Sequence, residues 1–218
     1  PVGMHDAQRT ERECVENPQL IDQIMQHEYP LGFSVIGEAI APEHDPGRVR
    51  YEAFFKKMYG ASPEEVERSL ELIDWMPRIF GQGTYQLRVT QINGVAQRIR
   101  CISDELEQLV ELHPEYSTFV QRPGGTYCWR MIPGTDRLSN HSFGMTLDIN
   151  AAESQYWQWD LRQAGQPISE ATPLTYRNTV PLEIVEIFER YGFIWGGKWY
   201  HYDTMHFEYR PELFRDCF

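Results

Sequence analysis

The chain has 218 residues, of which 41% are hydrophobic and 24% are charged, and this fits one globular domain with room for an extension. The formal net charge of −12 argues against a nucleic-acid partner, because phosphate binding needs clustered Lys and Arg side chains. No apolar run approaches the ~18 residues of a membrane span. The sequence begins at Pro1 without an initiator Met, so we expect that a leader was removed or trimmed.

The first 60 residues contain three recognisable features. Residues 11–28 have a weak helical periodicity, and Asp45-Pro46-Gly47 is typical of a turn. Residues 51–60 place aromatic side chains at helical spacing and end at a glycine, which predicts an amphipathic helix.

A second helix is predicted to begin with a capping box. Ser62 is a typical N-cap, Pro63 stands at the first helical position, and Glu65 follows three residues after the cap. Apolar residues continue on one helical face as far as Ile73, so we expect the helix to extend that far.

The next segment predicts a β-hairpin and then a helix. Apolar and polar residues alternate on both sides of Asn93-Gly94, with arms at 85–89 and 95–101. Asn-Gly between β-rich arms is the strongest short-range hairpin signal. Residues 103–113 return to helical spacing.

Past residue 120 the predicted elements are short. They are strands at 126–131, 144–150 and 205–209 and a helix at 180–193. Helices that flank a small, antiparallel sheet indicate an α+β fold.

Two clusters in this part of the chain have chemical potential. His141 and Asp148 stand seven residues apart around Gly144, a spacing that suits a loop histidine followed by a strand aspartate. Asp203 and His206 stand three residues apart, so one turn can present both to the same point. A His, Asp, His set with an open fourth position suits a catalytic zinc ion, and a neighbouring carboxylate can accept a proton from water.

The segments around these residues resemble a known family. The segment "SNHSFGMTLD" resembles the SxHxxGxAxD signature of the M15 zinc peptidases, with Thr146 in place of the usual alanine. That family includes D-Ala-D-Ala carboxypeptidases and dipeptidases and L-Ala-D-Glu endopeptidases. The second segment, "DTMHFE", is more similar to the endopeptidase branch than to the ExxWH of the carboxypeptidases. The resemblance covers about residues 122–212.

This resemblance implies the roles of five residues. His141, Asp148 and His206 would bind one Zn²⁺ per chain, and Asp203 would be the general base. Arg130 would hold a substrate carbonyl or carboxylate, where a guanidinium can stabilise a developing oxyanion.

Arg130 and three further residues can each take more than one role. Arg130 can also form a salt bridge at a strand edge, and Arg137 could take its place beside the substrate. Ser139 can hydrogen-bond a ligand or the substrate, or cap its own turn. Trp195 can form a wall of a peptide groove or belong to the core. His201 can assist the leaving amine or be a partly exposed histidine.

The resemblance also implies a fold and a domain organisation. We expect a hedgehog/DD-peptidase-like α+β fold, in which a small antiparallel sheet with the zinc site is flanked by helices. Residues 1–80 would form a mainly helical extension packed on the core, and residues 81–218 would form the catalytic domain.

The predicted function is a zinc metallopeptidase that hydrolyses bonds in peptidoglycan stem peptides, with the bond between L-Ala and D-Glu as the expected target. One alternative is a D-Ala-D-Ala carboxypeptidase, with Lys198 as the carboxylate anchor. Another is a non-catalytic cell-wall-binding module on the same fold. A third is a closed structural zinc site with Cys128 or His201 as a fourth ligand. A stem-peptide substrate implies an extracytoplasmic location.

The four cysteines select none of these alternatives. Their spacing contains no CxxC pair and argues against a cysteine-based zinc site. Four cysteines allow three pairings, and the formation of a disulfide depends on the compartment. The sequence therefore leaves open which cysteines pair and whether any disulfide forms. They are Cys14, Cys101, Cys128 and Cys217.

Overall fold

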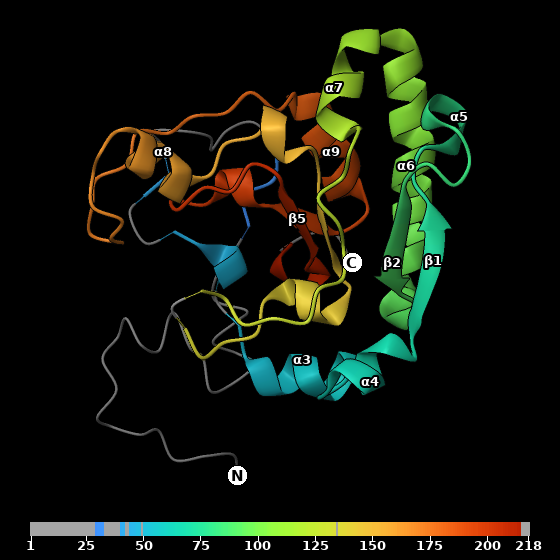
Figure 1. Cartoon of the computed structure of the whole chain (residues 1–218), viewed down its shortest axis with the longest axis horizontal. Coiled ribbons are helices and arrows are strands. Elements are labelled where there is room, and N and C mark those ends of the chain that lie inside the picture. Colours follow the sequence, from blue (N-terminus) through green and yellow to red (C-terminus); the bar gives the residue numbers. More distant parts are fainter. Residues whose placement is uncertain (1–28, 33–39, 42–43, 49, 134, 215–218) are drawn as a thin grey trace.

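A computed structural model describes residues 29–32, 40–41, 44–48, 50–133 and 135–214 of the chain (Figure 1). These residues form a mixed structure of helices and two small antiparallel sheets, which is compatible with the predicted α+β class. The helix predicted at 11–28 lies outside the described residues. No helix among the described residues has the length and apolar character needed to cross a membrane.

The first two predicted helices begin where the sequence indicates. Helix α3 (Glu52–Tyr59) ends at Gly60. Helix α4 (Pro63–Glu67) is capped by Ser62, whose Oγ accepts a hydrogen bond from the backbone N–H of Glu65 at 3.3 Å. The prediction that α4 continues to Ile73 is wrong, because the chain leaves the helix and enters strand β1 (Leu70–Asp74).

The predicted hairpin around Asn93-Gly94 is also wrong. Strand β1 pairs antiparallel with β2 (Gln86–Thr90), and the short helix α5 (Pro77–Phe80) lies between these two strands in the chain. The expected second arm is instead the first part of helix α6 (Val95–Leu112). Asn93 and Gly94 have φ values of +57° and +69°, so they form a turn that starts a helix rather than one that joins two strands.

Helix α6 forms because its apolar residues also fit a helical period. Val95, Ile99, Ile102 and Leu106 are fully buried and lie on one face. This face packs against the β1–β2 sheet, and the three elements stand together on the right of Figure 1. The helix predicted at 103–113 is thus confirmed as the second half of a longer one.

The second sheet has the strand order β3-β5-β4 and lies near the centre of the molecule (Figure 1). Strand β5 (His206–Tyr209) pairs antiparallel with both β3 (Thr146–Asp148) and β4 (Phe193–Trp195). Helix α9 (Leu182–Arg190) contacts β4 and confirms the helix predicted in this region. The strand predicted at 126–131 does not form, and only isolated bridges at Gly125, just before it, and at Met131 are present.

The remaining helices of the described residues are short and connect these parts. Two are α-helical, α7 (Ser117–Val120) and α8 (Trp157–Gln163). The others are 3₁₀ turns: η2 (Pro46–Arg48), η3 (Ile92–Gly94), η4 (Pro114–Tyr116), η5 (Asn140–Phe143), η6 (Ala151–Glu153), η7 (Gly196–Lys198) and η8 (Pro211–Leu213).

One main hydrophobic core connects the two sheets. Val66 and Ile73 come from before residue 80, and Phe143 and Phe207 come from the later part of the chain. The β1–β2 pairing also joins strands on either side of the expected boundary between residues 80 and 81. The division into an extension and a catalytic domain stays a prediction.

Candidate metal centre

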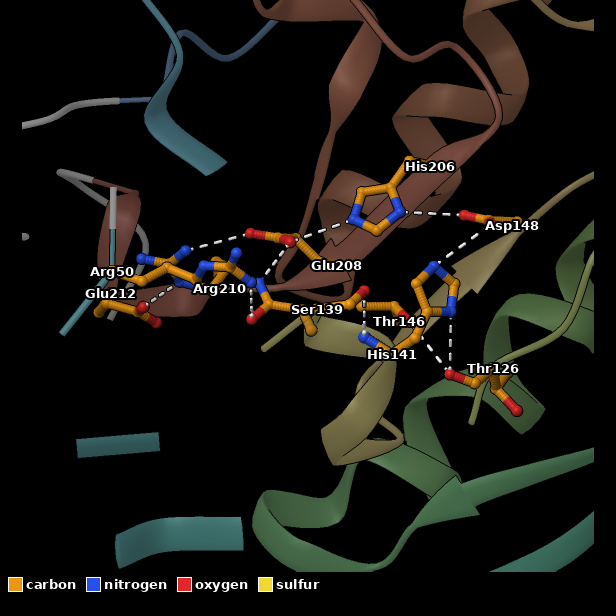
Figure 2. Close-up of polar contacts among 11 residues, drawn as sticks. Arg50, Thr126, Ser139, His141, Thr146, Asp148, His206, Glu208, Arg210 and Glu212 are labelled. Atoms are coloured by element: carbon orange, nitrogen blue, oxygen red, sulfur yellow. Dashed lines mark hydrogen bonds and ion pairs between the residues drawn. The ribbon is translucent and has the colours of Figure 1, made fainter. Parts of the chain in front are cut away.

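Three predicted metal ligands meet at one point between η5 and the central sheet. Ligand atoms of His141, Asp148 and His206 all lie within 4.8 Å of one another. Nε2 of His141 is 3.2 Å from one carboxylate oxygen of Asp148, and Nδ1 of His206 is 2.9 Å from the other (Figure 2). The β3–β5 register pairs Asp148 directly with His206, so the sheet itself places two of the three ligands together.

The second ring nitrogen of each histidine has its own acceptor. Nδ1 of His141 is 3.1 Å from the carbonyl oxygen of Thr126, and Nε2 of His206 is 3.1 Å from a carboxylate oxygen of Glu208 (Figure 2). In the neutral rings these nitrogens donate the proton, so the lone pairs of the opposite nitrogens face Asp148. Two imidazole nitrogens and a carboxylate form a donor set that fits catalytic zinc.

Local sequence explains the position of His141. Ser139 caps η5, because its Oγ accepts a hydrogen bond from the backbone N–H of His141 at 3.4 Å. Gly144 ends the turn with a φ of +65°, and a Cβ there would stand 2.6 Å from a methyl carbon of Leu70. The signature glycine therefore has both a conformational and a packing reason.

Comparison with known families agrees with this geometry. Residues 133–209 match the model of a family described as D-alanyl-D-alanine carboxypeptidase. This match supports an M15 family peptidase, and residues 133–209 are called the M15 segment below. It contains all three candidate ligands and Asp203, whereas Arg130 lies just before it. Neither the curated proteins nor the solved structures include a significant match to the chain.

The charges in the M15 segment favour a cation at the centre. Burial alone would lower the pKa of His206, but hydrogen bonds to Asp148 and Glu208 and their negative charges raise it to about 10. Burial would raise the pKa of Asp148, yet the charges and hydrogen bonds of the two histidines hold it well below its ordinary value. In the metal-free protein a proton on His206 supplies the positive charge at this centre, and a bound divalent ion would replace that proton.

Asp203 lies beside this group and has a carboxyl with unusual properties. Burial and the negative charge of Asp148 raise its pKa to about 7, although His206 and Arg130 act in the opposite direction. Its Oδ1 is buried and has no hydrogen-bond partner among the described residues. A carboxylate with a pKa near neutrality and an unused oxygen is suited to accept a proton from water.

The candidate ligands line a cleft of about 320 Å³. Arg130 and Ser139 line the same cleft, and Arg130 is exposed, with no acidic partner among the described residues. Arg137 instead lines a neighbouring cavity of about 330 Å³ and donates to the carbonyl oxygen of Arg48 at 3.2 Å. Of the two arginines, Arg130 is therefore the one placed near the candidate metal ligands.

The structure places two other predicted residues differently from what the sequence led us to expect. His201 is buried rather than partly exposed, and it lines the cleft with its Nδ1 at 2.6 Å from a carboxylate oxygen of Asp45. Trp195 is fully buried in the core, where its Nε1 donates to the carbonyl oxygen of Thr204 at 2.9 Å. That position does not suit the expected contact of Trp195 with a substrate.

Lys198 does not suit the role of a carboxylate anchor. Its side chain is 1% exposed, and its ammonium group lies 2.5 Å from Glu189 and 2.9 Å from the carbonyl oxygen of Pro30. The ammonium is thus already neutralised inside the protein and is not available in the cleft.

The structure also bears on the alternative of a closed structural zinc site with a fourth protein ligand. Among the described residues the ligand group consists of three side chains, and it includes neither Cys128 nor His201. Cys128 is an exposed free thiol, and Cys101 is free as well. Cys14 and Cys217 lie outside the described residues.

Sequence inspection did not identify Glu208 or Thr126. Glu208 is buried, and its carboxylate also contacts Asn140 at 2.6 Å and Arg210 at 3.1 Å (Figure 2). Its position two residues after His206 in a strand was a usable signal, because alternate residues of a strand share a face. Thr126 acts through its backbone carbonyl, which the identity of the side chain does not reveal.

Proposed function

We propose that the chain is a zinc peptidase that hydrolyses peptide bonds in peptidoglycan stem peptides outside the cytoplasm. The observation that supports this most is the convergence in one cleft of a His, Asp, His donor set with the half-buried carboxylate of Asp203, whose Oδ1 has no hydrogen-bond partner among the described residues. The M15 match supports a hydrolase acting on peptide bonds.

The residues that line the cleft have separate roles in amide hydrolysis. Nε2 of His141, the carboxylate of Asp148 and Nδ1 of His206 would hold the zinc ion. When bound, zinc supplies Lewis-acid chemistry that polarises an amide carbonyl and makes water a better nucleophile. Asp203 takes the proton of the attacking water and passes it to the leaving amine. Arg130 stabilises the negative charge that develops on the carbonyl oxygen.

We further propose that cleavage occurs within the stem peptide, at the bond between L-Ala and D-Glu. A carboxypeptidase needs a fixed cation for the free carboxylate of its substrate. Lys198, the cation in the glycine- and aromatic-rich segment before β5, is instead neutralised by Glu189. The alternative, a D-Ala-D-Ala carboxypeptidase, is favoured by the description of the matching family, and Arg130 would then be the anchor.

The metal assignment is tested by zinc analysis of purified variants. The unchanged protein should bind close to one zinc per chain, and His141→Ala and His206→Ala should each lose most of it. Asp203→Ala should keep zinc but lose activity by ~10²–10⁴-fold, as expected for removal of a general acid–base group. Full zinc occupancy in either histidine variant would contradict the ligand assignment, and loss of zinc in Asp203→Ala would make Asp203 a ligand.

The choice of bond is tested with two synthetic peptides and purified sacculi. The peptides are a stem pentapeptide ending in D-Ala-D-Ala and the same peptide with an amidated carboxyl terminus. An L-Ala-D-Glu endopeptidase should cut both and release no D-Ala, and mass spectrometry of digested sacculi should give matching fragments. Release of D-Ala from the free-acid peptide alone would establish the carboxypeptidase alternative. Binding of sacculi without any cleavage by the zinc-loaded protein would favour the non-catalytic module.

A further inference from the structure

A histidine–aspartate pair forms part of the cleft wall beside the candidate metal ligands. Both carboxylate oxygens of Asp45 hold His201, one accepting its backbone N–H at 2.9 Å and the other lying 2.6 Å from Nδ1 of the ring. Both residues are buried, with exposed fractions of 8% for Asp45 and 6% for His201. The indole ring of Trp157, which also lines the cleft, contacts the imidazole edge-on at a centroid distance of 4.7 Å. The orientation of the imidazole is therefore fixed on two sides.

The other nitrogen of this ring has no bonding partner. Nε2 of His201 is buried and has no hydrogen-bond partner among the described residues. A buried polar atom without a partner lowers stability, so such an atom in a cleft wall indicates a ligand that completes the bond. With the proton on Nδ1 and directed to Asp45, Nε2 of the neutral ring is an acceptor.

The state of Asp45 agrees with this arrangement. Burial would raise its pKa, but the hydrogen bond with His201 and the charges of His201 and Arg48 lower it below the ordinary value. Asp45 is therefore an ionised acceptor that keeps the proton on Nδ1. It belongs to the segment 44–48, outside the matched M15 residues.

We propose that His201 is a substrate-binding residue whose Nε2 accepts a hydrogen bond from a backbone N–H of the peptide in the cleft, and that Asp45 is the positioning residue that fixes its tautomer. A peptide backbone supplies N–H donors along its whole length, which matches an acceptor in the wall of a peptide cleft. This inference rests on the proposed peptidase function.

The positioning role has a test that requires neither substrate nor turnover. In zinc-loaded protein labelled with ¹⁵N-histidine, NMR at mildly alkaline pH should show His201 with an unprotonated Nε2. In Asp45→Asn the amide oxygen is needed for the backbone N–H of His201, so the NH₂ group faces Nδ1 and the proton should move to Nε2. Protonated Nε2 in the unchanged protein, or the same tautomer in both proteins, would overturn the role of Asp45.

The binding role is tested in an Asp203→Ala background, in which the stem pentapeptide can be titrated without cleavage. Additional His201→Ala or Asp45→Asn should weaken peptide binding about 10-fold, the equivalent of one good hydrogen bond, and should leave zinc content unchanged. His44→Ala is the matched control, because the Nε2 of His44 is also buried without a partner among the described residues but His44 does not line the cleft. It should bind the peptide normally.

The outcomes distinguish a failure of the role of His201 from a failure of the proposed peptidase function. Equal peptide binding with and without His201 would overturn this inference and leave the peptidase function intact. Equal weakening by His44→Ala and His201→Ala would also overturn it, because the effect would then be structural. No peptide binding in the background protein, together with no cleavage of sacculi by the unchanged enzyme, would refute the proposed function and this inference with it.

Discussion

Glu208→Gln is the most informative single change that the structure suggests. The carboxylate of Glu208 accepts from Nε2 of His206 at 3.1 Å, from Asn140 at 2.6 Å and from Arg210 at 3.1 Å (Figure 2). Burial would raise its pKa, but the hydrogen bond from His206 and the charges of Arg210, His206 and Arg50 lower it to about 2, so Glu208 is ionised at neutral pH. The substitution keeps the shape of the side chain and removes its charge.

Two separate losses should follow. Replacement of the charged acceptor behind a metal-bound histidine by a neutral amide should lower metal affinity by ~10–100-fold, which corresponds to about 1.4–2.7 kcal/mol of zinc binding. The fold should also lose stability, because breaking a buried ion pair costs about 3–5 kcal/mol when it leaves a charge unpaired. Arg210 keeps its contact with Glu212, so we expect the second loss to fall at the lower end of that range.

The assay measures both quantities on the same proteins. Zinc affinity comes from competition with a chelator on folded protein, and the free energy of unfolding comes from urea titration of the metal-free form. Glu212→Gln is the matched control, because Glu212 pairs with Arg210 on the side away from the hydrogen bond between Glu208 and His206. It should lower stability and keep zinc affinity. Unchanged zinc affinity in Glu208→Gln, or an equal loss in both variants, would refute the role of Glu208 in orienting His206.

Four further outcomes follow from the same structure. Zinc affinity should fall in acid, because the ligand His206 must be deprotonated to bind; calorimetry over a pH series measures this. The lowered pKa of Asp45 means that its ionised form stabilises the fold above the ordinary carboxyl pKa, and that this stability is lost as the pH falls through the lowered value. The difference in Tm between Asp45→Asn and the unchanged protein should therefore close below about pH 4. Arg130→Lys should reduce kcat with zinc content unchanged, because lysine keeps the charge but not the planar guanidinium. Gly196→Ala should lower both Tm and activity, because a Cβ there would stand 2.5 Å from the backbone oxygen of Asp203.

The ligand group could be predicted from the sequence because its geometry is local. His141 and Asp148 are separated by one capped turn and one short strand, and Asp203 and His206 by a single turn. Only one long-range relation, the pairing of β3 with β5, is needed to bring the two halves together. Local spacing alone only made this group plausible, and the resemblance of the surrounding segments to the M15 signature assigned the roles.

Prediction from local spacing was wrong where one segment fits both the period of a strand and the period of a helix. Residues 95–101 alternate in polarity, yet Val95, Ile99 and Ile102 also lie on one helical face. The turn at Asn93-Gly94 is compatible with either outcome, since its positive φ values can end a strand or start a helix. Packing of α6 on the β1–β2 sheet decides between them, and that packing is a property of the whole fold.

The residues around the cleft show a second reason why the sequence alone could not predict the whole site. Asp45 and His201 stand 156 positions apart, and Arg50 and Asn140 stand 90 apart, where the guanidinium of Arg50 donates to the amide oxygen of Asn140 at 2.5 Å. Asn140 in turn donates to Glu208, so a segment near residue 50 is connected to the carboxylate behind His206. No spacing rule links such residues in a single sequence. The M15 segment supplies the metal ligands and the base, but the groups that orient His201 and neutralise Glu208 include residues that precede it by more than 80 positions. A chain cut down to the matched segment would therefore keep the candidate ligands and lose part of what orients them.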